Sequence, residues 1–364
     1  MYISKLAIHR LRCINKMEVV PHSSCNIIVG ENGSGKTSIL EAIYMLGFGR
    51  TFRKSKTAEL VQFDQNDLTI FAATESDYQD TATFGIRKYK NGSSEIKVRG
   101  KKAKRLSELS SEFPIISFTS DTIDLIDSGP SGRRKFIDWL VFHVKHSEDV
   151  AEIYRQFDKV LEQRNEALKQ ADLKMIQAWT PKFVELNLQI QSMRNEVISQ
   201  LQDYLNKSYR QVESSKVNSS PTITYKLGWN SEFDLAELLA KNQGFEIKRR
   251  SCNYGVHRDD IIFQLDDTPV KNILSRGETK RFVLALLLAA EALLVTKSQK
   301  HCIWVLDDIA AELDYQSIVN AFSVGKSQNN QMFFTCIEKD LAIIQQAINF
   351  EHAVFHVKHG QLLN

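Results

Sequence analysis

The amino-acid sequence predicts an α/β fold in which mixed sheets surround a glycine-rich loop, with a helical hairpin inserted into the domain. Three observations support this prediction. An apolar strand, a glycine-rich loop and an amphipathic helix follow one another over residues 25–46. Two apolar stripes at helical spacing occupy residues 153–205. Strands and helices then alternate again to the last residue, so the two ends of the chain read as one α/β unit.

Residues 1–130 are expected to form the N-terminal part of the main domain. The segment "YISKLAIHRL" alternates between apolar and polar residues, and "CNIIVG" is a short apolar run that stops at a glycine. Strand character returns in "LTIFAATE", "TATFGIRKY" and "SEIKVRG", and "KNGSS" is a hairpin signal between the last two. These patterns predict strands before and after the glycine-rich loop.

Residues 131–211 are expected to form the inserted helical subdomain. Their two stripes predict two helices of about 20–25 residues each, and Thr180-Pro181 is interpreted as the start of the second helix. Strict heptads are not sustained, which favours core-facing helix faces over a dimer zipper. Residues 212–364 are then expected to complete the main domain, with a short helix near 234–242 and a strand at "DIIFQL".

Composition narrows the class of protein. The formal net charge is only +3, so any acidic partner must meet local basic clusters. The five cysteines are scattered and odd in number, which favours a reducing compartment over a disulfide framework. The N-terminus does not read as a secretory signal, and the longest apolar run, residues 282–290, is too short to span a membrane. The expectation is a soluble cytoplasmic protein with no membrane partner.

The glycine-rich loop matches the pattern G-x-x-x-x-G-K-[ST] in full. Its glycines allow backbone N–H groups to point at phosphate oxygens, and the following helix adds its positive end. Lys36 is expected to reach the β- and γ-phosphates, and Thr37 to bind Mg²⁺. The sequence therefore predicts binding of ATP and Mg²⁺ by the loop and the residue after it: Gly30, Glu31, Asn32, Gly33, Ser34, Gly35, Lys36, Thr37 and Ser38.

A second strand is expected to bring a carboxylate to the metal. The segment "HCIWVLDDIAAELD" contains an apolar strand that ends in Asp307-Asp308. Asp307 is predicted to hold Mg²⁺ through water, and Asp308 to polarise the attacking water. The loop and this strand lie about 270 residues apart, whereas a small P-loop kinase or GTPase would place them much closer.

The stretch "LSRGETKRFVLALLLAAEALL" resembles the "LSGGQ" signature of ABC-type ATPases. In that family the serine and glycine of one protomer touch the γ-phosphate held by another, which implies roles for Ser275 and Gly277 beside Lys36 and Asp308. Arg276 and Glu278 stand where many signatures have glycine and glutamine. The expected fold is thus an ABC-type ATPase head, with mixed sheets around a P-loop core and an inserted helical hairpin subdomain.

Further stretches, "SGPSGRRKFID" and "GVHRDDIIF", complete a resemblance over the whole chain to the RecF family of recombination-repair ATPases. Val256 departs from the proline usual in that family, and no glutamine was found to sense magnesium. Arg12 is a candidate phosphate contact, Asp314 stands in a D-loop-like position near a dimer interface, and Thr335 stands where ABC transporters often place a switch histidine. The shorter Asp308, in place of a glutamate, implies slow hydrolysis suited to a switch.

The resemblance also implies partners. It implies an ATP-dependent homodimer that binds DNA at gapped duplexes and single-stranded/double-stranded junctions, helped by RecR and RecO, in gap repair, replication restart and the SOS response. Several basic clusters could contact DNA phosphates. The alternative interpretation is that they are solvent-exposed surface charges without a binding role. The candidate DNA-binding residues are Arg53, Lys54, Lys56, Lys101, Lys102, Lys104 and Arg105.

Three other functions fit the sequence less well. An SMC-like structural tether, in which ATP licenses assembly only, is disfavoured by the short predicted helices. A metabolic P-loop kinase is disfavoured by the signature before the acidic strand. A transporter ATPase subunit is disfavoured by the helical insertion.

Overall fold

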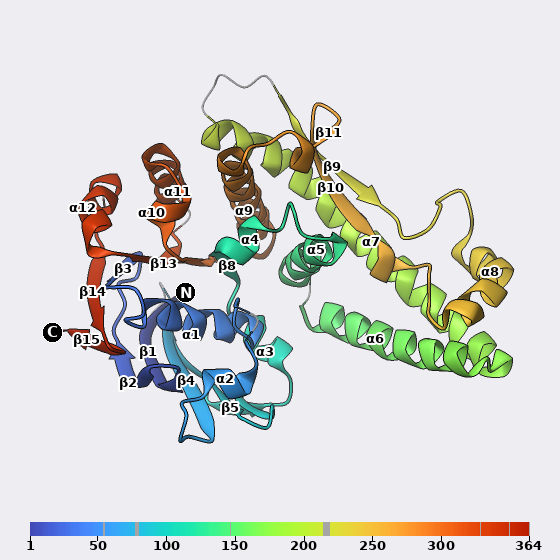
Figure 1. The fold of residues 1–364 in the computed structure, drawn as a ribbon, viewed down its shortest axis with the longest axis horizontal. Helices are drawn as coiled ribbons and strands as arrows, with labels where there is room; N and C mark the ends of the chain where they lie inside the picture. The colour runs from blue at the N-terminus through green and yellow to red at the C-terminus, as the bar shows by residue number, and fades with distance from the viewer. Residues whose placement is uncertain are drawn as a thin grey trace. The chain divides into compact units, whose positions relative to one another are not determined.

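The computed structural model describes residues 1–53, 55–76, 80–145, 147–213, 219–327, 329–348 and 350–363. The chain divides into two compact units, each built from segments distant in sequence (Figure 1). Unit 1 comprises Met1–Asp124, Ser208–Val217 and Ser275–Asn364, and unit 2 comprises Leu125–Lys207 and Asn218–Leu274. The glycine-rich loop, the acidic strand and the signature stretch from Ser275 onward all belong to unit 1.

Unit 1 contains a six-stranded sheet in the order β15-β14-β3-β13-β12-β8. Neighbouring strands are parallel except for β15, which pairs antiparallel with β14. Every residue of β3, β12 and β13 is buried, as expected for parallel strands covered on both faces. The strands are β3 (Cys25–Val29), β8 (Ile115–Phe118), β12 (Ile303–Leu306), β13 (Gln331–Cys336), β14 (Ala353–Lys358) and β15 (Gln361–Leu363).

The second sheet of unit 1 is antiparallel, in the order β2-β1-β4-β5-β6-β7. Buried and half-buried residues alternate along most of β4, the pattern of a strand with one face in the core. Ile43 of the first helix shares one apolar core with Ile70 of this sheet and Val305 of the parallel sheet. The strands are β1 (Tyr2–Leu11), β2 (Ile14–Val19), β4 (Asp67–Glu75), β5 (Thr81–Tyr89), β6 (Ser94–Val98) and β7 (Lys101–Ala103).

One helix of unit 1 is apolar on all sides over part of its length. Residues 282–290 are all buried, which explains why the longest apolar run of the sequence is a core helix. Within the described ranges, no helix is both long and apolar enough to cross a membrane. The helices of this unit are α1 (Lys36–Phe48), α2 (Thr57–Leu60), α3 (Leu106–Ser110), α4 (Ser120–Ile123), α9 (Arg276–Ser298), α10 (Ile309–Glu312), α11 (Tyr315–Ser327) and α12 (Glu338–Ala347).

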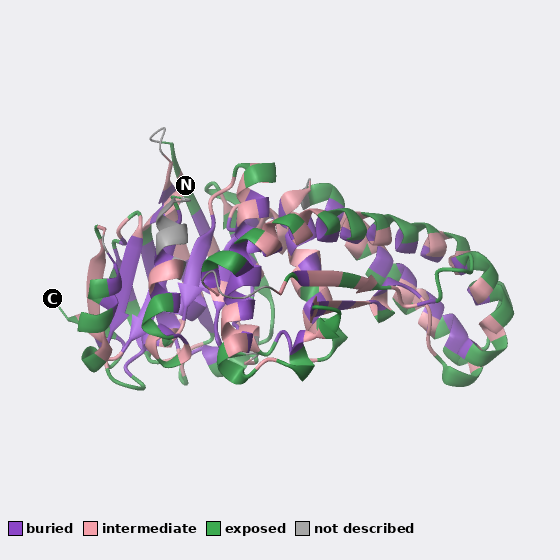
Figure 2. Ribbon diagram, turned by 90° about the horizontal axis from the view of Figure 1, so that it is seen from above, coloured by how far each residue is buried: buried purple, intermediate pink, exposed green. Residues whose placement is uncertain are grey.

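Unit 2 is built around two long helices, α6 (Ser147–Gln170) and α7 (Leu173–Val212), along which buried and exposed positions alternate (Figure 2). Residues of both predicted apolar stripes share one core, and the later residues of the second stripe, Val197, Leu201 and Leu205, are also buried. The last residues of α7 belong to unit 1. The other elements are α5 (Pro130–Val144), α8 (Leu235–Arg249), two short 3-10 helices (Val256–Arg258 and Val270–Asn272) and the antiparallel strands β9 (Pro221–Lys226), β10 (Asp260–Leu265) and β11 (Thr268–Pro269).

The predicted helix start at Thr180-Pro181 is wrong, because Pro181 lies inside α7, which has 40 residues. A proline inside a helix costs about 3 kcal/mol. Ile176 and Phe183, on either side of it, are both buried in the core of unit 2, and this burial holds the helix together. The Thr180 hydroxyl also donates to the Ile176 carbonyl at 2.7 Å, an additional hydrogen bond in the turn before the proline.

The two units also divide the chain differently from the predicted boundaries 1–130, 131–211 and 212–364. Residues 218–274, assigned from the sequence to the main domain, lie in unit 2. The reason is a shared core, since Trp229, Leu239 and Val256 pack in the same apolar cluster as the long helices. The short helix expected at 234–242 is extended to Arg249 as α8.

Candidate functional site

The glycine-rich loop connects β3 to α1 at the carboxyl end of the parallel sheet. Gly35, immediately before α1, has φ 111°, a backbone conformation that other residues rarely adopt. Gly30 lies so close to the neighbouring strand that a Cβ there would be 2.3 Å from the Val357 carbonyl oxygen. The sequence needs glycine at both positions for different reasons. The resulting loop and helix N-terminus form the type of backbone cradle that binds phosphate.

Two polar side chains of the loop fit an anion. Lys36 is only 5 % exposed, and its Nζ donates to the carbonyls of Gly30 (2.7 Å) and Glu31 (3.0 Å). An ammonium group has three donors, so this arrangement keeps Lys36 within the loop with donor capacity remaining. The Ser34 hydroxyl is buried and has no hydrogen-bond partner in the part of the chain that the structure describes. A phosphate in the loop would supply the missing partner.

The structure brings Thr37 and Asp307 together from opposite ends of the sequence. The Thr37 hydroxyl donates to Asp307 Oδ1 at 3.2 Å, at the end of β12. Burial raises the pKa of Asp307, and the charge of Asp308 adds to this, while contacts with Thr335, Arg53 and Thr37 oppose it. The sequence predicted this pair for Mg²⁺, and the two oxygens do lie within reach of a single cation.

Arg53 lies beside the same two residues. Its Nη2 donates to the Thr37 hydroxyl (3.2 Å) and is 3.7 Å from Asp307 Oδ2. The sequence analysis assigned Arg53 to DNA contacts only and gave no signal for this position. The structure thus places a guanidinium next to the two oxygens that are expected to face the metal.

Arg12 forms an ion pair with Glu41 of the protein itself. Its guanidinium makes two hydrogen bonds to the fully buried carboxylate of Glu41 on α1, at 2.5 and 2.8 Å, and one to the Ser55 hydroxyl at 3.1 Å. This bidentate pair anchors the helix that follows the loop to the turn between β1 and β2. The predicted phosphate contact of Arg12 stays a prediction.

The signature stretch forms the N-terminus of α9. Ser275 caps the helix, and Ser275 N donates to Glu278 Oε2 at 2.8 Å in a capping box. The hydrogen bond from Ser275 lowers the pKa of Glu278. Glutamate and glutamine both complete a capping box, so nothing in the structure explains the departure from glutamine. Ser275, Arg276 and Gly277 are exposed in this chain.

Comparisons with known proteins agree with this geometry. The model of the RecF/RecN/SMC N-terminal domain family matches residues 2–361. A DNA replication and repair protein RecF of Shewanella amazonensis is 33 % identical over 363 residues, covering 100 % of this chain and 99 % of the relative. This chain belongs to the RecF family.

Solved structures lead to the same conclusion. A structure described as the recombination mediator protein RecF-ATP in the RecFOR pathway has a TM-score of 0.87 at 25 % identity, covering 100 % of this chain and 97 % of that one. An SMC head bound to the C-winged helix domain of ScpA has a TM-score of 0.60 at 15 % identity, covering 100 % and 96 %, and shows the common fold alone. The predicted fold class, an ABC-type ATPase head with a helical insertion, is confirmed.

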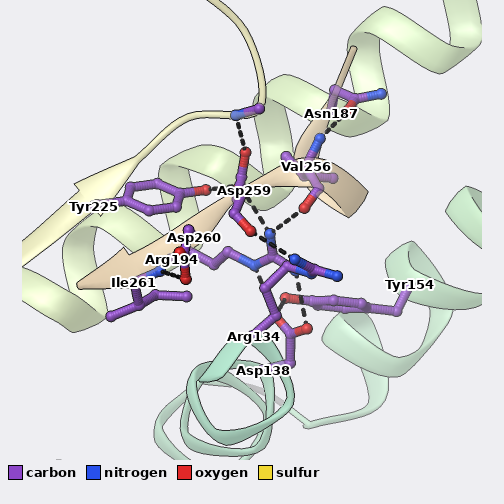
Figure 3. A network of polar contacts seen from close by, with 11 residues as sticks. Arg134, Asp138, Tyr154, Asn187, Arg194, Tyr225, Val256, Asp259, Asp260 and Ile261 are labelled. Carbon is purple, nitrogen blue, oxygen red and sulfur yellow. Dashed lines mark hydrogen bonds and ion pairs between the residues drawn. The ribbon is translucent and has the colours of Figure 1, made fainter. Parts of the chain in front are cut away.

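The two RecF-like motifs outside the nucleotide site meet in a buried ionic network in unit 2 (Figure 3). Arg194 of α7 binds both carboxylate oxygens of Asp138 (2.8 and 2.9 Å) and also Asp259 Oδ2 (2.8 Å). Arg134 donates to the Asp259 carbonyl at 2.6 Å, and Tyr225 donates to the same residue's carboxylate. "SGPSGRRKFID" and "GVHRDDIIF" therefore join α5, α7 and β10.

Three further residues of these RecF-like motifs have defined surroundings in unit 2. Arg133 pairs with Asp260 at 2.9 and 3.2 Å, so it is structural within unit 2. Val256, where the family usually has proline, donates its N–H to Asn187 Oδ1 at 2.7 Å, which a proline could not do. Burial lowers the pKa of His257 to about 4, so this histidine is neutral at physiological pH.

The remaining predicted residues are Asp314 and the candidate DNA-binding residues. Asp314 Oδ1 accepts from Ser317 N at 2.8 Å and so caps the start of α11, with Arg281 nearby. Of the candidate DNA residues of this RecF-family chain, Lys54 lies outside the described residues. Apart from Arg53, the remaining candidates are exposed. Lys56 lies just before α2, and the rest lie on the edge strand β7 or just after it: Lys101, Lys102, Lys104 and Arg105.

Proposed function

We propose that this protein is an ATP-dependent DNA-binding clamp that dimerises on ATP and acts in the recombinational repair of gapped DNA. One observation carries the proposal. Thr37, the residue after Lys36, meets Asp307 at the carboxyl end of the parallel sheet, although about 270 residues separate the two in sequence. Membership of the RecF family and the likeness to a RecF-ATP structure support ATP as the nucleotide.

Different residues of the site would bind the phosphates and the metal. The glycine loop and the N-terminus of α1 would hold the phosphates, with Lys36 at the β- and γ-oxygens and Ser34 as a further donor. Thr37 would hold Mg²⁺ directly, and Asp307 through water. The metal, when bound, neutralises charge that develops on the phosphate oxygens. Asp308 would orient the attacking water, and its short side chain favours slow turnover.

The signature end of α9 supplies the second half of the site. Ser275 and Gly277 are exposed, so they are available to a nucleotide held by a second copy of the chain. Lys36 of one protomer would then face Ser275 of the other, and ATP would bridge the two. Closure around DNA phosphates at gaps and junctions follows, with RecR and RecO as the partners that the RecF family implies. Hydrolysis would reopen the dimer.

Sedimentation velocity with and without Mg-ATP tests the dimer. Wild type should shift from monomer to dimer with ATP, whereas Lys36→Ala and Ser275→Arg should stay monomeric. Binding to single-stranded, duplex and gapped DNA, measured on the same samples, should rise with ATP in wild type only. Dimerisation that is independent of ATP, or undiminished in both variants, would refute the clamp. A dimer that forms without enhanced DNA binding would favour ATP-licensed assembly of a structural tether.

A further inference from the structure

Strand order places one buried hydroxyl between the two nucleotide motifs. In the parallel sheet β13 lies between β3, which leads into the glycine loop, and β12, which leads into the acid pair. Thr335, near the end of β13, pairs with Ile28 on one side, and Phe334 pairs with Leu306 on the other. Thr335 is therefore level with Asp307, and it is fully buried.

The Thr335 hydroxyl makes two hydrogen bonds, both to the acid pair. It donates to Asp307 Oδ1 at 2.8 Å and accepts from Asp308 N at 2.8 Å. A hydroxyl has one donor and can accept, so the two bonds are compatible. Asp308 has φ 48° and ψ 47°, a left-handed conformation that is unfavourable for a non-glycine residue. The bond to its N–H helps to hold the chain in that turn.

We propose that Thr335 is the positioning residue for the acid pair. Its hydroxyl binds Oδ1 of Asp307, the same oxygen that accepts from the Thr37 hydroxyl, and so fixes the orientation of the carboxylate beside the expected metal ligand. It also fixes the backbone from which the Asp308 carboxylate extends. This inference rests on the proposed function, since it assigns Thr335 to the Mg-ATP site.

The other contacts of Asp307 are of a different kind. Thr37 and Arg53 reach the carboxylate from the loop side, and the Arg53 side chain is 49 % exposed. Both contacts must rearrange when a cation takes the Thr37 oxygen. Thr335 reaches the carboxylate from the adjacent strand β13 and can stay in place. It therefore defines the carboxylate before and after the metal binds.

A core-filling role for Thr335 makes a different prediction. Threonine is common in strands, and a buried methyl and hydroxyl could serve packing alone. Valine keeps the shape and removes the hydroxyl, whereas serine keeps the hydroxyl and removes a methyl. A packing role would make Thr335→Ser the worse variant, and the positioning role makes Thr335→Val the worse one. Thr74, buried in β4 of the same unit, offers a matched control as Thr74→Val.

The test uses the full-length protein and a fluorescent ATP analogue, titrated with Mg²⁺ and also measured in EDTA. Loss of a residue that orients a metal ligand typically costs about 10–100-fold in metal affinity or activity. Thr335→Val should bind the analogue in EDTA like wild type, but need 10–100-fold more Mg²⁺ for half-saturation. Thr335→Ser and Thr74→Val should titrate like wild type.

The outcomes distinguish failure of the positioning role of Thr335 from failure of the proposed function. If Thr335→Val needs no more Mg²⁺ than wild type for half-saturation, the positioning role is overturned. A wild type that binds no nucleotide, or binds it without any effect of Mg²⁺, refutes the proposed function itself. If circular dichroism shows that Thr335→Val does not fold, Thr335→Cys takes its place. Its thiol is a weaker donor, so a Mg²⁺ requirement equal to that of Thr335→Ser overturns the proposal.

Discussion

A buried carboxyl behind the acidic strand should make the stability of unit 1 depend on pH. Glu291 of α9 is fully buried, and its Oε1 accepts from Trp304 Nε1 (2.7 Å) and from Asn330 Nδ2. Oε2 has no partner within the described part of the chain. Burial raises the pKa of Glu291 from 4.5 to about 8, although its two hydrogen bonds act in the opposite direction. The folded protein therefore keeps this proton at neutral pH.

The sign of the effect follows from which state binds the proton. Between pH 4.5 and 8 the unfolded chain loses it and the folded chain keeps it. Stability must then fall as pH rises, by up to about 1.4 kcal/mol for each pH unit, and level off above pH 8. Over the whole window the loss is on the order of a few kcal/mol.

Glu291→Gln removes the titration but keeps an acceptor for Trp304 and Asn330. Its amide nitrogen would lie where Oε2 has no partner, which costs about 1–3 kcal/mol at all pH values. We expect the variant to be less stable than wild type at pH 5 and equal or more stable at pH 8.5. The assay is urea unfolding at half-unit pH steps, followed by fluorescence, because Trp304 is the one tryptophan of unit 1.

Glu148→Gln, at an exposed site in α6, serves as the control and should leave the slope unchanged. Parallel stability curves for wild type and Glu291→Gln between pH 5 and 8 would refute the reasoning, because they would show that Glu291 does not hold a proton in the folded state.

Three further predictions concern substitutions whose effects differ in kind. Val256→Pro, which restores the residue usual in the family, removes the N–H bonded to Asn187 and should destabilise unit 2 by about 1–3 kcal/mol in urea unfolding; an unchanged midpoint would contradict the role given to that bond. Glu278→Ala should cost about 0.5–2 kcal/mol through loss of the capping box, with Glu278→Gln close to wild type, as measured by thermal unfolding. Arg164→Met leaves the buried Glu246 unpaired and should cost about 3–5 kcal/mol, and adding Glu246→Leu should recover most of this; no recovery in the double variant would mean that packing, not charge, dominates there.

The strand, glycine loop and helix could be predicted from the sequence because their requirements are local. A strand, a glycine loop and a helix are contiguous, and Gly35 and Lys36 act through their own backbone and the adjacent carbonyls. The pairing of Thr37 with Asp307 could also be predicted, since loops of this kind need a carboxylate at the end of a second strand and the wholly apolar strand Ile303–Leu306 ends at Asp307. These inferences needed no knowledge of the sheet order.

What the sequence could not reveal depends on contacts between distant residues. Pro181 reads as a helix start, and burial on both sides of it overrides that local signal. Arg12 and Arg53 look alike in sequence, but one binds buried Glu41 and the other approaches Thr37. The role of Thr335 follows from the insertion of β13 between β3 and β12, which strand patterns alone do not fix.

The close approach of β14 to the glycine loop has a consequence for synthesis on the ribosome. Gly30 packs against the Val357 carbonyl, and Gly360 N donates to the Ser34 carbonyl at 2.7 Å. The loop is made before unit 2 is complete, but the strand that supports it is made after unit 2. Unit 2 is complete in the nascent chain some 80 residues earlier. A growing chain should therefore complete the support of the glycine loop only after β14 and the turn that follows it have been made, well after unit 2.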